Sequence, residues 1–289
     1  MGTSSPFGGG SNKNPLIPSW LGAGSSGDDG DNDGGDNGDS NDNGADDSPG
    51  GQNASPIKDN TTPSNRYTKA KGNFTSFVRS GGSDRRKLGK ALSSYVHTTA
   101  GGSRNATRRM LSDTLAGATF AQFLNTANTV GLREAARRLD LKDLENKDSI
   151  EIYAAMVDVV CMPGGDLDDS FARSAYSEAI IEVMELGLPD LEQPSLESIA
   201  IIMERFITNS IYNRIINAIG AKAITLPENI DKANNIIDQL KDFIRAAVSD
   251  AMTRSNNNFQ TDDMRTNINN LYEQSFTILQ SLSESEVSE

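Results

Sequence analysis

A long N-terminal stretch with almost no apolar side chains sets the first limit on what this chain can fold into. Residues 22–65 consist mainly of Gly, Asp, Asn, Ser and Pro. Such a stretch cannot bury enough apolar surface to offset the entropy of ordering its backbone, so we expect a disordered Gly/Asp/Asn-rich tail. Its aspartates also repel one another and extend the chain. Residues 22–65 are therefore predicted to be an acidic linker, and the folded domain is expected to begin near residue 66.

After residue 66 the apolar side chains recur at intervals of three and four residues, the pattern of amphipathic helices. We find no alternating strand and no strand-plus-helix repeat, so the predicted fold class is all-α over residues 66–284, followed by a short tail over 285–289. The last three predicted helices show the pattern best, with faces formed by Ile199, Ile202, Met203, Phe206, Ser210 and Ile211, by Ile237, Leu240, Ile244, Ala247, Val248 and Ala251, and by Ile268, Leu271, Ser275, Ile278 and Leu282.

Several helix boundaries follow from capping residues. Ser83 and Ser103 each precede a helical pattern, and the one after Ser103 is expected to run through Phe123. The stretches 148–151 and 225–228 have the spacing of a capping box. Gly131 is predicted to separate the helix after Ser103 from a short helical segment.

Charge is distributed unevenly along the chain, whose net charge is −13. Residues 58–110 carry twelve Lys or Arg against two Asp, whereas the segments before and after them are acidic. This basic segment could contact nucleic-acid phosphates, dock on an acidic partner or on acidic parts of the same chain, or remain a solvated surface. Its candidate contact residues are Arg85, Arg86, Lys87, Arg104, Arg108 and Arg109.

The sequence offers little for catalysis or metal binding. It has one histidine, His97, and one cysteine, Cys161, which cannot form a four-ligand zinc site. Cys161 lies in an apolar run and is predicted to be a buried structural thiol, and His97 lies in an ordinary helical pattern. The acidic run 29–34 matches half of a calcium loop, but Ser40 stands where a glutamate is needed. We therefore predict no catalytic residue, no metal and no resident cofactor.

No targeting segment is evident in the sequence. No run of about 18 apolar residues exists, and the N-terminus lacks the basic and apolar regions of a signal peptide. We therefore expect a cytoplasmic protein without membrane contact.

The first 21 residues differ in character from the linker. Met1 precedes a small residue and is normally removed, which leaves Gly2 with an unhindered α-amine. Myristoylation is not expected, because Pro6 stands where that signal needs Ser or Thr. The run PLIPSWL, residues 15–21, combines two prolines with apolar anchors and contains the only tryptophan of the chain. It is predicted either to dock in a groove of a partner as a linear motif or to pack on its own domain.

Three groups of these N-terminal residues resemble the N-terminus of QatB-like proteins, which are components of the four-gene Qat anti-phage defence system of bacteria. They are Met1-Gly2-Thr3-Ser4, the pair Gly8-Gly9, and Pro15-Leu16-Ile17-Pro18-Ser19-Trp20. The family is encoded beside an ATPase, a QueC-like deazaguanine enzyme and a TatD-like nuclease, and the resemblance implies that these are partners.

The resemblance also implies a role for the N-terminus. A QueC-like enzyme activates a deazaguanine carboxylate with ATP, and the Gly2 amine would replace ammonia as the acceptor, which leaves a covalent deazaguanine adduct on Gly2. Thr3 and Ser4 would thread the active-site channel. Pro15, Leu16, Ile17, Pro18 and Trp20 would bind the enzyme surface. The chain would then be a non-enzymatic defence component whose helical domain is an assembly platform.

Two other readings stay open. The chain could be a nucleic-acid-sensing adaptor that uses the basic segment 58–110. It could also be a pure scaffold whose tail docks on a partner without being modified.

Overall fold

The predicted all-α fold class is confirmed. The computed structural model describes residues 66–141, 144, 147–161, 166–188, 190–223, 229–256, 259–261 and 263–282, with the backbone alone over 220–223, and these residues contain helices but no strand. The division of the chain at residues 21, 65 and 284 stays a prediction, because those positions lie outside the described residues or at their edges.

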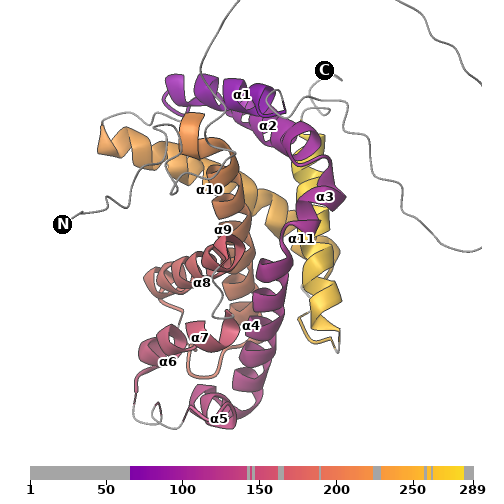
Figure 1. The fold of residues 1–289 in the computed structure, drawn as a ribbon. Helices are drawn as coiled ribbons and strands as arrows, with labels where there is room; N and C mark the ends of the chain where they lie inside the picture. The colour runs from indigo at the N-terminus through magenta and orange to yellow at the C-terminus, as the bar shows by residue number, and fades with distance from the viewer. Residues whose placement is uncertain are drawn as a thin grey trace, which may run out of the picture. The chain divides into compact units, whose positions relative to one another are not determined.

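The described residues form eleven α-helices and one π-helical turn, shown in Figure 1. In chain order they are α1 (Thr68–Arg79), α2 (Arg85–Ser94), η1 (Tyr95–Thr99), α3 (Ser103–Arg108), α4 (Leu111–Val130), α5 (Leu132–Arg138), α6 (Ser149–Ala155), α7 (Val157–Val160), α8 (Leu167–Leu186), α9 (Leu196–Ala223), α10 (Ile230–Arg254) and α11 (Met264–Ser281).

Helix α9 is the centre of the domain. It packs against α8, α10 and α4, while α11 packs against α10, α4 and α3 (Figure 1). The face predicted for α9 is buried in full, and its neighbours Ile207, Thr208 and Asn209 are buried as well. A helix that is buried on most of its circumference needs partners on several sides, which explains why α8, α10 and α4 all pack against it.

Aromatic side chains fill the junction of α4, α8 and α9. Phe120 makes edge-to-face contacts with Tyr176 and Phe206, with ring centroids 4.7 and 6.0 Å apart. Gly117, one turn before Phe120, lets α4 approach closely: a Cβ there would lie 2.9 Å from Cε1 of Phe206. The helices therefore meet at a distance that only glycine permits on α4.

The predicted capping box at the start of α6 is confirmed. The Asp148 carboxylate accepts a hydrogen bond from the Glu151 amide, and the Glu151 carboxylate accepts one from the Asp148 amide. Ser195 likewise accepts a hydrogen bond from the Ser198 amide at the start of α9. Gly131 separates α4 from α5 as predicted, with a φ of 85° that favours glycine.

Other boundaries differ from the predictions. The N-cap of α2 is Asp84 and not Ser83, because the Asp84 carboxylate accepts a hydrogen bond from the Lys87 amide. The helix predicted from Ser103 through Phe123 is in fact two helices. The non-helical residues Arg109 and Met110 separate α3 from α4. The capping box predicted over 225–228 lies outside the described residues, and α10 begins with Asn229 as its N-cap.

Candidate functional site

All the residues predicted to act at the N-terminus lie outside the described part of the chain. They are Gly2, Thr3, Ser4, Pro15, Leu16, Ile17, Pro18 and Trp20. Their acceptor and docking roles stay predictions, and the same holds for the calcium-loop pattern over 29–34.

Half of the predicted basic residues come together at the start of α2. They line a surface depression of about 600 Å³. Since residues three and four apart on a helix are neighbours, Lys90 lies beside the side chains of the first turn. The depression is bounded by Ser83, Asp84 and four cations that we call the α2 basic cluster: Arg85, Arg86, Lys87 and Lys90.

The α2 basic cluster is electrostatically costly for its own helix. Three of its cations occupy the first turn, where the helix dipole favours negative charge, and that turn contains no acidic residue. Each such cation costs about 0.3–1 kcal/mol when it is exposed. The Asp84 carboxylate, which also lines the depression, serves as the N-cap. An external anion in the depression would remove part of this cost.

The other predicted cations lie on a different helix. Arg104 and Arg108 belong to α3, and Arg109 follows its last residue. Arg104 forms an ion pair of 3.3 Å with Glu273 of α11, and Arg108 donates a hydrogen bond to Asn105. The predicted patch is thus divided into two groups, of which only the α2 basic cluster lines a depression.

Lys and Arg residues before and after position 110 differ in how often they form ion pairs with carboxylates. Among the described Lys and Arg residues up to position 109, only Arg104 forms an ion pair. Beyond that position most described cations are paired with carboxylates, as the following residues show: Arg133, Arg137, Arg138, Lys147, Arg173, Arg205, Arg214, Lys241, Arg245 and Arg254. Sequence counting identified an excess of positive charge, and the structure shows that, among the described residues, Arg104 alone of the cations up to position 109 is paired with a carboxylate.

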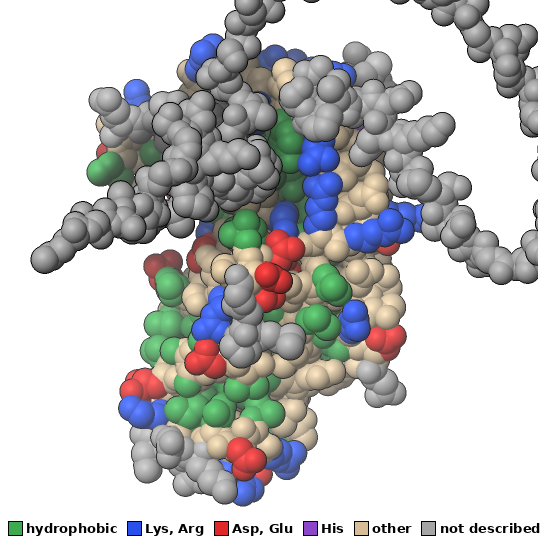
Figure 2. Space-filling view, in the orientation of Figure 1, with side chains coloured by type: hydrophobic (Ala, Val, Ile, Leu, Met, Phe, Trp, Pro, Cys, Tyr) green, Lys and Arg blue, Asp and Glu red, His purple; other side chains and the backbone are tan. Residues whose placement is uncertain are grey.

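The surface view shows the same contrast. In Figure 2, Lys and Arg side chains gather over α2 and α3 in the upper part of the face, whereas acidic, basic and apolar side chains are mixed below. The large exposed apolar side chains of the described residues all lie after position 110, and they are Leu111, Leu139, Ile150, Leu167, Ile181, Met184, Leu186, Leu196 and Ile230. None of these exposed apolar side chains belongs to α1, α2 or α3.

A buried charge cluster joins α4, α8 and α9, and the sequence analysis did not identify it. Arg214 donates to the Asp168 carboxylate at 2.5 Å and to the Asp113 carboxylate at 3.3 Å. The Asp113 side chain is fully buried, and that of Asp168 is about half exposed. Burial raises the pKa of Asp113 to about 6, and the neighbouring Arg214 guanidinium only partly opposes this.

Several polar atoms in this cluster and beside it have no hydrogen-bond partner among the described residues. They include Oδ1 of Asp113, Nε of Arg214 and the hydroxyl of Tyr272, which comes from α11. Burial also raises the pKa of Tyr272 well above its usual value. Asp113 and Tyr272 are fully buried, whereas Asp168 reaches the surface, so the cluster acts mainly on the stability of the helix packing.

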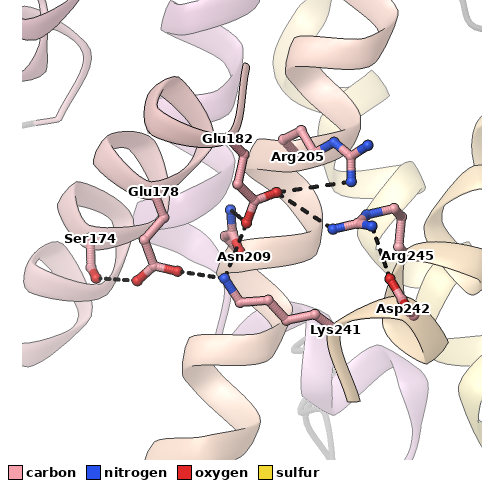
Figure 3. Close-up of polar contacts among 8 residues, drawn as sticks. All are labelled: Ser174, Glu178, Glu182, Arg205, Asn209, Lys241, Asp242 and Arg245. Atoms are coloured by element: carbon pink, nitrogen blue, oxygen red, sulfur yellow. Dashed lines mark hydrogen bonds and ion pairs between the residues drawn. The ribbon is translucent and has the colours of Figure 1, made fainter. Parts of the chain in front are cut away.

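A second polar cluster, shown in Figure 3, fastens α8 to α9 and α10. Glu182 of α8 accepts hydrogen bonds from Lys241 at 3.1 Å and from Asn209 at 3.3 Å. It also lies 3.9 Å from Arg205 and 3.5 Å from Arg245. One carboxylate therefore contacts three cations from two other helices.

The lone cysteine and the lone histidine have no catalytic setting in the structure. Cys161 is buried as predicted, and burial raises its pKa to about 12, so the thiolate is scarce at neutral pH. His97 is exposed on the π-helical turn η1 and not in an ordinary α-helix. No group of His, Cys, Asp and Glu among the described residues could hold a metal ion. None of the described helices is long and apolar enough to cross a membrane.

Comparison with known proteins identifies the family. Residues 101–279 match the family model described as Qat anti-phage system associated protein QatB. This match covers more than half of the chain and the helices from α3 to α11, but not α1 and α2, and it does not include the N-terminal residues that carry the resemblance. No curated protein and no solved structure matches the chain. The chain belongs to the QatB family and is a component of the Qat anti-phage defence system.

Proposed function

We propose that this chain is the acceptor component of the system, and that its Gly2 amine receives a deazaguanine from a QueC-like partner. The family match supports a role in anti-phage defence. The acceptor role is supported by the resemblance of the first twenty residues and by the chemistry of glycine, whose amine has no Cβ to hinder it. An α-amine ordinarily has a pKa near 8 and is partly neutral at pH 7, so it can act as a nucleophile.

The proposed reaction balances with one co-substrate. The partner activates the deazaguanine carboxylate with ATP. The Gly2 nitrogen then attacks the activated carbonyl, the C–N bond of an amide forms, and the bond to the activating group breaks. The nitrogen loses one proton to a base of the partner. The chain contributes the amine and its delivery, and the PLIPSWL run raises the concentration of the amine at the partner.

We propose that the helical domain is an assembly platform and not an enzyme. Its chemically active groups support this, because Cys161 is buried and the carboxylates of the two polar clusters are engaged by cations of neighbouring helices. The exposed apolar side chains of α8, notably Ile181 and Met184, suit contact with another component of the system.

Intact mass spectrometry tests the acceptor role. When the protein is co-expressed with its neighbouring genes, we expect loss of Met1 and a mass increase of one deazaguanine acyl group. Gly2→Pro should abolish the adduct, because it changes the primary amine into a hindered secondary one. Ser25→Pro in the linker is the matched control and should keep the adduct. An adduct that persists in Gly2→Pro would refute the proposal.

A substitution of Trp20 tests the docking role of the PLIPSWL run. Trp20→Ala should weaken co-purification with the QueC-like enzyme and lower the fraction of modified protein. If Trp20→Ala breaks the complex while Gly2→Pro leaves phage defence unchanged, the chain is a scaffold whose tail only docks.

A further inference from the structure

The α2 basic cluster has the features of a polyanion-binding surface. Its cations lack carboxylate partners among the described residues, whereas most cations after position 109 are paired. Arg85, Arg86 and Lys90 are exposed, and together with Lys87 they line one depression. The cluster also opposes the dipole of its own helix, so an anion bound there would stabilise the fold.

The composition of this surface distinguishes between two kinds of acidic partner. Protein interfaces have an apolar core and are depleted in lysine. On α1, α2 and α3 the large apolar side chains are buried, and no large apolar side chain of these helices is exposed. Nucleic-acid interfaces need cations for phosphates and no apolar core. The surface therefore fits a phosphate backbone better than an acidic protein.

We propose that the α2 basic cluster binds the phosphate backbone of nucleic acid without reading its sequence. Four cations within two helical turns engage about four phosphates of a duplex. The described residues that line the depression are Ser83, Asp84 and the four cations, and none of these is an aromatic that could stack on a base. The proposal does not depend on the modification of Gly2, since it uses only residues of the helical domain.

Fluorescence anisotropy of the full-length protein with a labelled 20-base-pair DNA duplex tests the proposal. Release of counterions from about four phosphates predicts that affinity falls about a hundredfold between 50 and 200 mM salt. A second duplex of unrelated sequence should bind within about twofold of the first, since phosphate contacts carry no sequence information.

Two double variants with the same change in net charge distinguish the effect of the α2 basic cluster on binding from the effect of net charge. Arg85→Glu/Arg86→Glu should weaken binding at least about tenfold. It should also make the slope of log affinity against log salt shallower, by the amount expected for the loss of about two phosphate contacts. The control Lys232→Glu/Arg265→Glu makes the same charge change at exposed cations in the first turns of α10 and α11, which also have no ion pair among the described residues. It should leave affinity within about threefold.

Misfolding cannot explain the expected loss. Glutamates in the first turn of a helix favour its dipole, which offsets the loss of the contact between the Arg85 guanidinium and the Phe243 ring at 5.8 Å, so both double variants should melt close to the unaltered protein. Equal weakening by the control, or affinity that does not respond to salt, would overturn the proposal. Binding of a labelled polyglutamate of equal charge as tightly as the duplex would overturn it too, because the surface would then fit an acidic protein equally well.

Discussion

Arg214 of α9 holds its guanidinium 3.3 Å from the carboxylate of Asp113 on α4, where the carboxylate is fully buried. A second carboxylate, Asp168 of α8, lies 2.5 Å from the same guanidinium and is about half exposed. One cation therefore links three helices around the centre of the domain, and its removal would leave a buried charge without a counterion.

We expect Arg214→Met to destabilise the protein by about 3–5 kcal/mol at pH 8, because it leaves ionised Asp113 buried and uncompensated. Urea unfolding followed by circular dichroism measures the change. The double variant Asp113→Asn/Arg214→Met removes both charges and should recover much of the loss. If the double variant is as unstable as the single one, packing by the Arg214 side chain and not charge explains the effect.

The raised pKa of Asp113 predicts a particular pH dependence. Between the pKa of the unfolded chain near 4 and the folded value of about 6, the folded protein holds a proton that the unfolded chain has released. The contribution of Asp113 to stability is therefore largest below pH 4 and falls by about 3 kcal/mol as the pH rises to 6.

Comparison with Asp113→Asn isolates this contribution from those of other carboxylates. The free energy of unfolding of the unaltered protein, minus that of Asp113→Asn, should fall between pH 4 and pH 6 and then level off. A difference that stays constant over this range would show that Asp113 has an ordinary pKa.

Gly117→Ala should destabilise the protein by about 1–2 kcal/mol. The new Cβ would lie 2.9 Å from Cε1 of Phe206 and 3.2 Å from Cγ2 of Ile268, so α9 and α11 would have to shift. The overpacking exceeds the gain of about 1 kcal/mol in helix propensity. Gly72→Ala on α1 is the matched control, since a Cβ there meets nothing within 4 Å, and it should stabilise by about 0.5–1 kcal/mol. Urea unfolding of the two variants should give opposite signs.

Glu182→Ala should cost about 2–3 kcal/mol, because it leaves Arg205, Lys241 and Arg245 close together without their shared carboxylate. Hydrogen exchange should show faster exchange of the α8 amides, since Glu182 fastens this helix to α9 and α10. Glu185→Ala, on the next turn of α8 and exposed, is the control and should change stability by less than about 0.5 kcal/mol. Equal effects of the two substitutions would mean that the cluster in Figure 3 contributes little.

Sequence patterns predicted the helical faces well where one side of a helix is apolar. The α9 face from Ile199 to Ile211 is buried, and the Asp148 capping box is present as expected. On α10 the buried residue is Ile236 and the predicted Ile237 is only partly buried, which is a shift of one position on the same helix.

The buried charges could not be found in this way. Asp113 lies in the first turn of α4, where an acidic residue is normally explained by the helix dipole, and its partner Arg214 is 101 residues away in sequence. Only the packing of α4 against α9 brings them together. The sequence also could not predict that the α2 basic cluster lacks carboxylate partners among the described residues. It shows how many cations there are, but not which carboxylates lie near them in the fold.

The burial of Cys161 makes the chain convenient to label. It is the only cysteine, it is 1% exposed, and burial raises its pKa to about 12. Thiolates are the form of cysteine that reacts with maleimides, so at neutral pH we expect almost no labelling of the unaltered protein. A single thiol introduced at an exposed position of the helical domain would then accept a dye or spin probe at one known site, with the original cysteine left in place.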